Sequence, residues 1–228
     1  MADRVLLYLM RGELAETRRL VYDVGRSMAL FHNQLASCGG ARSLLASHTL
    51  EEIVKDRCRL ALLIKENKYI VKKICSAMME LLLSYTEEPC RTPIGHGDLH
   101  LYQILTGENR IVYTDPGPEP YTQTMPCLEY DIASLVRSIE YIDHMIAALL
   151  GDTKVIARDL ATSLLSGYRR ERQLPDKKTL ELLYLARTIY EYYYEYSNQT
   201  GFESIPLSSL KAYLLEGSTL IGRLVGHD

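Results

Sequence analysis

Apolar residues recur at three- and four-residue steps over most of the chain, a spacing that places them on one face of an α-helix. This pattern predicts a first helix over residues 13–37. Thr49 and Glu52 form a capping box that opens a helical stretch over residues 50–86, with a break expected near Asn67. Further helices are expected over roughly 128–150, 153–172, 176–198 and 207–225.

Closely spaced prolines and glycines interrupt this helical pattern in the middle of the chain. Two short runs, Ile104-Leu105 and Arg110 to Thr114, flank the turn-forming residues Thr106 to Asn109, which predicts a β-hairpin. Long irregular loops in a compact domain are usually functional. We therefore expect one mainly α unit, in which two helical parts enclose functional loops and a small hairpin. The parts of this single unit, residues 1–228, are 1–89, 90–127 and 128–228.

Charge and hydropathy argue against two classes of partner. The chain has 228 residues and a net charge of −3, with a pI of about 6.1, so nothing indicates a nucleic acid or an anionic membrane surface. No apolar run reaches the roughly 18 residues that a membrane helix needs. The N-terminal segment lacks the cleavage site of a secretory signal. We expect a cytoplasmic protein that binds neither nucleic acid nor membrane.

The five cysteines are widely spaced, without the pairs or the histidine-flanked patterns of zinc sites. Cys58 and Cys75 lie among helical apolar residues, where buried free thiols are expected. Cys90 and Cys127 flank the loop region on either side, and the sequence leaves open whether they pair.

The candidate chemistry lies in the ten residues from His96 to Leu105, HGDLHLYQIL, together with Asp115. Asp98 precedes Gln103 by five residues, and the predicted hairpin then delivers Asp115. A phosphotransferase needs one carboxylate to take the proton of the acceptor hydroxyl, and oxygen ligands that hold Mg²⁺ on the phosphates. The spacing makes Asp98 the candidate base. Gln103 and Asp115 become the candidate Mg²⁺ ligands, a sparse set of the kind that Mg²⁺ favours.

These motifs resemble the aminoglycoside-phosphotransferase-like kinases, and within them the bacterial maltokinases. Residues 96–105 match the catalytic motif, and Pro118-Glu119-Pro120 stands where the maltokinases have Gly-Glu-Pro after the metal aspartate. The likeness continues through Asp131 to Ser138, Tyr190-Glu191, Tyr194-Glu195, Asn198 and Ile205-Pro206-Leu207, and more weakly at Gly25-Arg26 and His32. Pro116-Gly117 departs from the family's Phe-Glu, whereas Gln103 agrees with the maltokinases and differs from the asparagine of wider relatives.

The resemblance spans most of the chain but only the family's C-terminal lobe. It implies a protein-kinase-like fold in which Asp98 is the catalytic base and Gln103 and Asp115 bind Mg²⁺ and ATP. The acceptor would be a sugar such as maltose, giving maltose 1-phosphate. The N-terminal nucleotide lobe is missing, because no G-x-G-x-x-G occurs and every lysine before the motif lies on a helical stretch. Val5 to Leu9 would be a remnant of the hinge between lobes, and a protein partner or self-association would cover the surface left exposed.

Four further residues are candidates for the acceptor site: His100, Glu119, Glu191 and Glu195. His100, like His96, also fits a role as a hydrogen-bond partner that braces the loop. Glu119 fits loop stabilisation as well as the acceptor side. Glu191 and Glu195 lie one turn apart on a predicted helix, which suits hydrogen bonds to a polyol or simple solvation.

Simpler interpretations stand beside several of these assignments. Asp115 also suits a cap of the proline-rich turn that follows it. Asp131 fits a helix N-terminal charge that the helix dipole favours. The tyrosines between residues 190 and 196 point around their helix at a 3.6-residue period, so several of them are expected in the core.

Functions of different classes therefore compete. The first is the catalytic and acceptor-binding part of a split or truncated sugar kinase. The second is a non-catalytic, pseudokinase-like binding or regulatory module. A third, phosphatase or nuclease chemistry at paired carboxylates of Asp98 and Asp115, rests on those two residues alone.

Overall fold

The computed structural model describes residues 1–37, 48–85, 95–107, 110–150 and 156–225. Most of these residues are helical, as the periodicity predicted. The helices are α1 (Ala2–Met10), α2 (Leu14–Ser37), α3 (Leu50–Ala61), α4 (Lys68–Leu83), α5 (Leu128–Leu150), α6 (Ala157–Arg169), α7 (Lys177–Ser197), α8 (Ser204–Glu216) and α9 (Leu220–Val225). A short 3-10 turn, Leu101–Gln103, leads into strands β1 (Ile104–Thr106) and β2 (Ile111–Tyr113).

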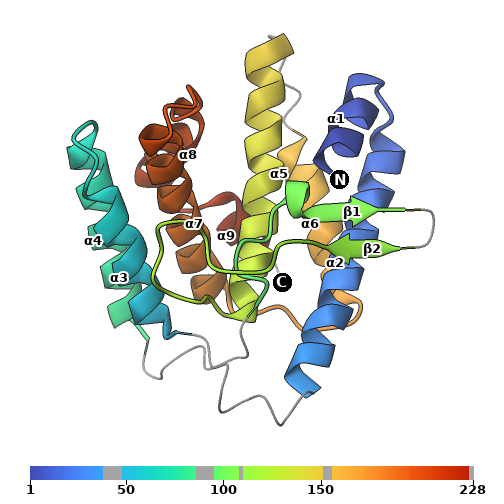
Figure 1. The fold of residues 1–228 in the computed structure, drawn as a ribbon, viewed down its shortest axis with the longest axis horizontal. Helices are drawn as coiled ribbons and strands as arrows, with labels where there is room; N and C mark the ends of the chain where they lie inside the picture. The colour runs from blue at the N-terminus through green and yellow to red at the C-terminus, as the bar shows by residue number, and fades with distance from the viewer. Residues whose placement is uncertain (38–47, 86–94, 108–109, 151–155, 226–228) are drawn as a thin grey trace.

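Helix α7 runs through the centre of the described fold and is buried over most of its length. Its neighbours include α3, α5, α8 and α9. Figure 1 shows α3 and α4 on one side of α7 and α5, with α1, α2 and α6 on the other. Charged side chains within the buried part of α7, Thr179 to Tyr192, therefore lie in the core, where they need partners.

Helices α2 and α6 pack with their backbones in close approach because each carries a glycine at the crossing. A Cβ added at Gly25 would overlap the carbonyl oxygen of Leu164, and one added at Gly167 would overlap that of Tyr22. These two glycines therefore allow α2 and α6 to pack backbone against backbone.

Two helix boundaries lie at residues with a left-handed backbone conformation. The expected break near Asn67 is confirmed, because Asn67 has φ 51° and separates α3 from α4. The single helix expected over 207–225 is wrong, because Gly217 at φ 70° ends α8 before α9 begins. Helix α8 also starts earlier than expected, since Pro206 fits the first turn of a helix.

The N-terminal residues, where a remnant of the hinge was expected at Val5 to Leu9, form helix α1. Val5 is 1% exposed and faces the core, which gives the segment a buried helical side. The amino group of Met1 donates a hydrogen bond to the carbonyl of Ile104 at 2.5 Å. Arg4 donates to the carbonyl and hydroxyl of Thr106 at 3.2 and 2.9 Å. Helix α1 thus supports β1.

The predicted hairpin is confirmed. Strands β1 and β2 are antiparallel, with Ile104 opposite Tyr113 and Leu105 opposite Val112. Ile104 is buried, whereas Leu105 and Val112 are 55% and 47% exposed on the other face. The hairpin therefore has one face in the core and an apolar pair on its outer face.

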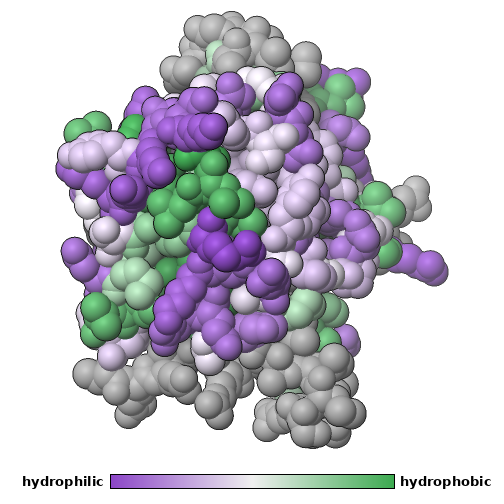
Figure 2. Space-filling model, turned by 60° about the vertical axis from the view of Figure 1, so that its left-hand side comes forward, coloured by the Kyte–Doolittle hydropathy of each residue, from purple (hydrophilic) through white to green (hydrophobic). Residues whose placement is uncertain are grey.

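An open groove separates α3 from α4 on the side of the molecule that Figure 2 brings forward, where apolar surface lies between hydrophilic side chains. Cys58 and Cys75 line its floor as free, buried cysteines, as predicted. Cys90 lies outside the described residues, so its pairing with Cys127 is untested. No helix in the described part of the chain is both long and apolar enough to cross a membrane.

Candidate functional site

The loop that carries Asp98 is held by Asp131, in the first turn of α5. The Asp131 carboxylate accepts hydrogen bonds from the backbone amides of His96 (2.7 Å) and Gly97 (3.1 Å). Nε2 of His32 lies 3.2 Å from the same carboxylate, and both side chains are fully buried. The sequence predicted a simple helix-terminal charge at Asp131. Asp131 does lie in the first turn of α5, and its buried carboxylate also holds the loop amides.

A second set of contacts ties this loop to the segment after the hairpin. Gly97 has φ 95°, and a Cβ there would overlap the carbonyl oxygen of Gly117, so the position requires glycine. The amide of Gly117 donates to the carbonyl of His96 at 2.9 Å. Nε2 of His96 lies 2.8 Å from the carbonyl of Thr114, which agrees with the interpretation of His96 as structural. These contacts join the two loops.

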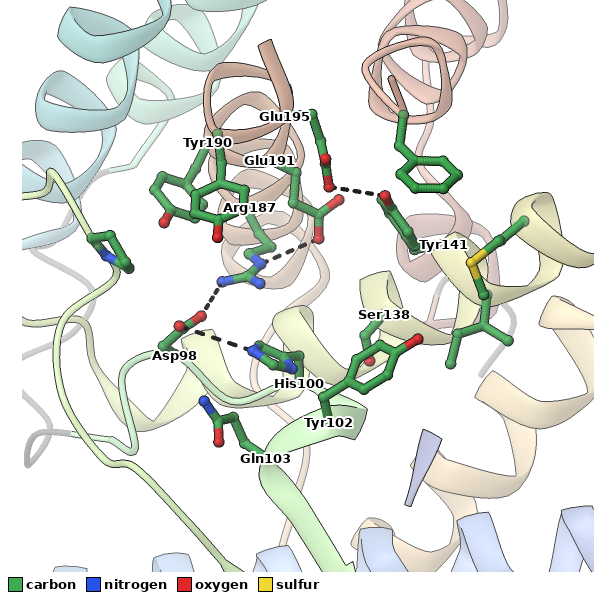
Figure 3. Close-up of a pocket in the computed structure, with 15 residues that line it drawn as sticks. Asp98, His100, Tyr102, Gln103, Ser138, Tyr141, Arg187, Tyr190, Glu191 and Glu195 are labelled. Carbon is green, nitrogen blue, oxygen red and sulfur yellow. Dashed lines mark hydrogen bonds and ion pairs between the residues drawn. The ribbon is translucent and has the colours of Figure 1, made fainter. Parts of the chain in front are cut away.

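Asp98 faces α7 across the cavity shown in Figure 3. Nη1 of Arg187 donates to Oδ1 of Asp98 at 2.7 Å. Nε2 of His100 lies 4.0 Å from Oδ2. Burial and the nearby Arg187 cation lower the pKa of His100 to about 4, so its ring is neutral at pH 7. Arg187 is then the cation beside Asp98.

The hairpin brings Gln103 and Asp115 together, as the spacing predicted. Nε2 of Gln103 lies 3.4 Å from Oδ2 of Asp115. The hydroxyl of Thr114 donates to Oε1 of Gln103 at 3.0 Å, and its amide donates to the Gln103 carbonyl at 2.9 Å. Asp115 has a left-handed backbone, φ 58°, which turns it toward Gln103. The amide nitrogen of Gln103 faces Asp115, and its oxygen faces Thr114. A Mg²⁺ ion held by both side chains would need the Gln103 amide turned over so that Oε1 faces the ion, with the remaining ligands taken from water and phosphate.

The described residues contain no group of three or more His, Cys, Asp or Glu side chains arranged to hold a metal. A site made of Gln103 and Asp115 alone therefore needs oxygens from a substrate. The Asp98 carboxylate pairs with Arg187.

A cavity of about 430 Å³ opens between the catalytic loop, α5 and α7. Among the expected site residues, Asp98, His100, Gln103, Glu191 and Glu195 line it. Asp115 and Glu119 do not. Figure 3 shows carboxylates from α7 on one wall and the loop residues on the opposite wall. The cavity thus joins the candidate base to candidate acceptor contacts.

Glu119 is 1% exposed and lies behind this cavity. Its carboxylate contacts Nε of Arg57 on α3 at 2.8 Å and Nη1 of Arg187 on α7. The hydroxyl of Tyr130 donates to it at 2.6 Å. Glu119 therefore binds the loop to two helices, the loop-stabilising role that the sequence left open.

Glu191 belongs to the same buried set of charges. It lies between Nε of Arg137 (2.8 Å) and Nε of Arg187 (3.2 Å). Burial raises the pKa of its carboxyl, and the two arginines oppose that shift. Arg137 in turn pairs with Glu140 at 2.6 Å. Positive and negative groups alternate along the whole set: Asp56, Arg57, Glu119, Arg187, Glu191, Arg137 and Glu140.

Glu195 lies one turn further along α7, nearer the cavity mouth. Its carboxylate accepts hydrogen bonds from the hydroxyl of Tyr141 at 2.8 Å and from that of Thr200. Tyr190 and Tyr192 are buried at 3% and 1% exposure, which confirms that several tyrosines of this run are in the core.

Sequence reasoning missed the roles of Arg57, Arg137 and Arg187, each of which is nearly or fully buried. A usable signal was present, because Arg137 follows Leu135-Val136 and Arg187 stands among Leu, Ala and Ile. An arginine inside an apolar helical run is rarely buried without a partner. Such positions predict buried ion pairs even when the partner is unknown.

Comparison with known proteins supports the fold. No protein-family model matches the chain, and no curated protein sequence does either. Solved structures of glucosamine kinase are similar at 18% identity. Crystal form A has a TM-score of 0.72 over 95% of this chain, and crystal form B has 0.71 over 94%. A complex with glucosamine, ADP and inorganic phosphate has 0.71 over 93%.

The chain covers 59%, 59% and 56% of those three chains, so it spans less than three fifths of their length. At this identity the likeness concerns the fold. The chain has a mainly helical, kinase-like fold shared with a sugar kinase, and nothing in these comparisons singles out the maltokinases.

Proposed function

We propose that this chain is the catalytic and acceptor-binding part of a sugar kinase, corresponding to the C-terminal lobe of a kinase-like fold. One observation carries the proposal. Asp98 and Gln103 line the same cavity, and Asp115 lies against Gln103. A base for a hydroxyl and one candidate cation ligand thus share one opening, and the second candidate ligand, Asp115, lies beside Gln103 without lining the cavity.

The proposed reaction transfers the γ-phosphoryl group of ATP to a sugar hydroxyl. The hydroxyl oxygen forms a bond to the γ-phosphorus as the bond from that phosphorus to the bridging oxygen of ADP breaks. Asp98 takes the hydroxyl proton. The contacts of its loop with Asp131 and with the Gly117 segment hold that carboxylate in place.

Gln103 and Asp115 are the residues that would hold Mg²⁺ together with ATP. A bound Mg²⁺ neutralises charge that develops on the phosphate oxygens. The Thr114 hydroxyl holds Oε1 of Gln103 while Nε2 faces Asp115. The amide would therefore turn over to present Oε1 to a cation, and the hydroxyl would then accept a hydrogen bond from the amide N–H.

The cavity suits a polyhydroxylated acceptor. Glu191 and Glu195 offer hydrogen-bond acceptors on one wall, and the ring of Tyr194, which is 38% exposed, offers a face for a sugar ring. The sequence resemblance points to maltose as the acceptor and to maltose 1-phosphate as the product. Glucosamine, which one of the similar structures holds, is the second sugar to test.

A separate nucleotide-binding lobe would complete the site. Tyr102, Leu105 and Val112 are 53%, 55% and 47% exposed on the hairpin side, and Leu7 of α1 is 44% exposed. Tyr102 also lines the cavity. This apolar surface beside the candidate Mg²⁺ ligands is where we propose that such a lobe docks, supplied by a protein partner or a second copy.

The test is a phosphotransfer assay with γ-labelled ATP and Mg²⁺, using maltose and glucosamine in parallel. It compares the chain alone with the chain co-purified from its native host. Asp98→Asn should abolish transfer in any active preparation. Asp159→Asn is the matched control, because Asp159 pairs with Arg18 on the surface and is half exposed.

Turnover in the co-purified preparation, lost in Asp98→Asn and kept in the control, supports the split kinase. Unchanged turnover in Asp98→Asn contradicts the base assignment. Absence of transfer in both preparations, with a partner still bound, supports the alternative of a non-catalytic binding or regulatory module.

A further inference from the structure

Among the described residues, Arg187 is the cation that contacts Asp98, at 2.7 Å. The His100 ring lies 4.0 Å from the other carboxylate oxygen. We propose that Arg187 is the positioning residue of the transfer step: its guanidinium fixes Oδ1 of Asp98 so that Oδ2 receives the acceptor hydroxyl. This inference rests on the proposed function, since it assigns a role within the same site.

The guanidinium of Arg187 is shared by three carboxylates from three parts of the chain. Nη1 donates to Oδ1 of Asp98 at 2.7 Å and also to Glu119. Nε donates to Oε1 of Glu191 at 3.2 Å. The Arg187 side chain is 7% exposed, so these contacts are largely shielded from solvent. Figure 3 shows the group reaching from α7 toward the catalytic loop.

These contacts leave the two oxygens of Asp98 unequal. Oδ1 is held by Arg187, whereas no hydrogen bond to Oδ2 comes from the residues that the structure describes. Nε2 of His100, 4.0 Å away, is too distant to occupy Oδ2. Since Asp98 lines the cavity, Oδ2 is the oxygen left for a hydroxyl donor.

An arginine suits this task because its N–H donors point in fixed directions from a planar guanidinium group. Nε and Nη1 together set the separation between Asp98, where the proton is taken, and Glu191, where the acceptor binds. A lysine keeps the positive charge but presents a single flexible point. Arg187→Lys therefore removes orientation while it retains charge compensation.

The experiment measures kcat and acceptor KM for Arg187→Lys in the preparation that shows transfer. Arg137→Lys is the comparison, because Arg137 contacts Glu191 and Glu140 but not Asp98. A displacement of reacting groups by about 1 Å costs on the order of 100-fold in rate. We expect Arg187→Lys to lower kcat by about that factor. Arg137→Lys should act mainly on the acceptor KM.

A decrease in kcat for Arg187→Lys that is no larger than for Arg137→Lys overturns the proposal, because a general loss of packing would affect both. A second readout does not depend on turnover. Crystal structures of the wild type and of Arg187→Lys should differ in the direction of the Asp98 carboxylate.

An unmoved Asp98 in the variant also overturns the positioning role, whatever the activity. If the wild type transfers phosphate to no acceptor, the proposed function fails. The crystallographic comparison then still decides whether Arg187 orients Asp98.

Discussion

Replacing Glu119 with glutamine tests whether the buried charges behind the cavity act as ion pairs. The side chain of Glu119 is fully buried between Arg57 and Arg187, whose own side chains are 0% and 7% exposed. Glutamine keeps the size of glutamate and can still accept the hydrogen bond from Tyr130. The substitution therefore removes one negative charge and replaces one accepting oxygen with an NH₂ group that cannot accept from an arginine.

The expected cost follows from the two arginines that lose a counter-charge. Removing one partner of a buried ion pair costs about 3–5 kcal/mol. Because the glutamine retains a hydrogen bond, we expect the lower end, about 3 kcal/mol. For a chain of this size that loss lowers the melting temperature by about 6–12 °C.

Urea unfolding at pH 7, followed by circular dichroism, measures this loss. The matched control is Glu171→Gln, which breaks the pair of Glu171 with Arg26 at 23% and 54% exposure. An exposed pair contributes about 0–1 kcal/mol. A loss for Glu119→Gln no larger than that of the control would refute the reasoning, because Glu119 would then not be compensating buried charge.

Two further predictions concern packing and pH. Gly25→Ala should destabilise the fold by about 1–3 kcal/mol because its Cβ would overlap the Leu164 carbonyl. In the control Gly107→Ala the added Cβ meets no atom, so thermal stability should change by less than about 0.5 kcal/mol. A Gly25→Ala variant as stable as this control would contradict the close approach of α2 and α6. The pKa of His100 is lowered to about 4 by burial and by Arg187, so between pH 6.5 and 4 the unfolded chain binds a proton that the native chain does not. Stability should fall as pH decreases through that window, by up to about 3 kcal/mol. Urea midpoints at pH 7 and pH 4.5 should show a smaller loss in His100→Gln, and an unchanged loss would assign the effect to other groups.

Local sequence signals predicted the parts of the fold that depend on local chemistry. The capping box predicted at Thr49 and Glu52 is present. The hairpin formed where a turn separates two short apolar runs. Gly217 was missed as a helix end because glycine within a periodic stretch is also tolerated inside helices.

The site was predictable only as far as residues close in sequence determine it. The spacing brought Gln103 to Asp115 because one hairpin joins them. The partner of Asp98, by contrast, is Arg187, which lies 89 residues away. No periodicity or motif connects such distant positions, because their contact depends on how α7 packs beneath the loop.

The alternating charges from Asp56 to Glu140 also constrain how this protein can change over evolutionary time. Each arginine sits between carboxylates supplied by different segments. A lineage that loses one member first passes through an ancestor with an uncompensated charge in its interior. We therefore expect homologous sequences to keep these positions together or to replace neighbouring members in concert with apolar residues, so that their substitutions covary across the family.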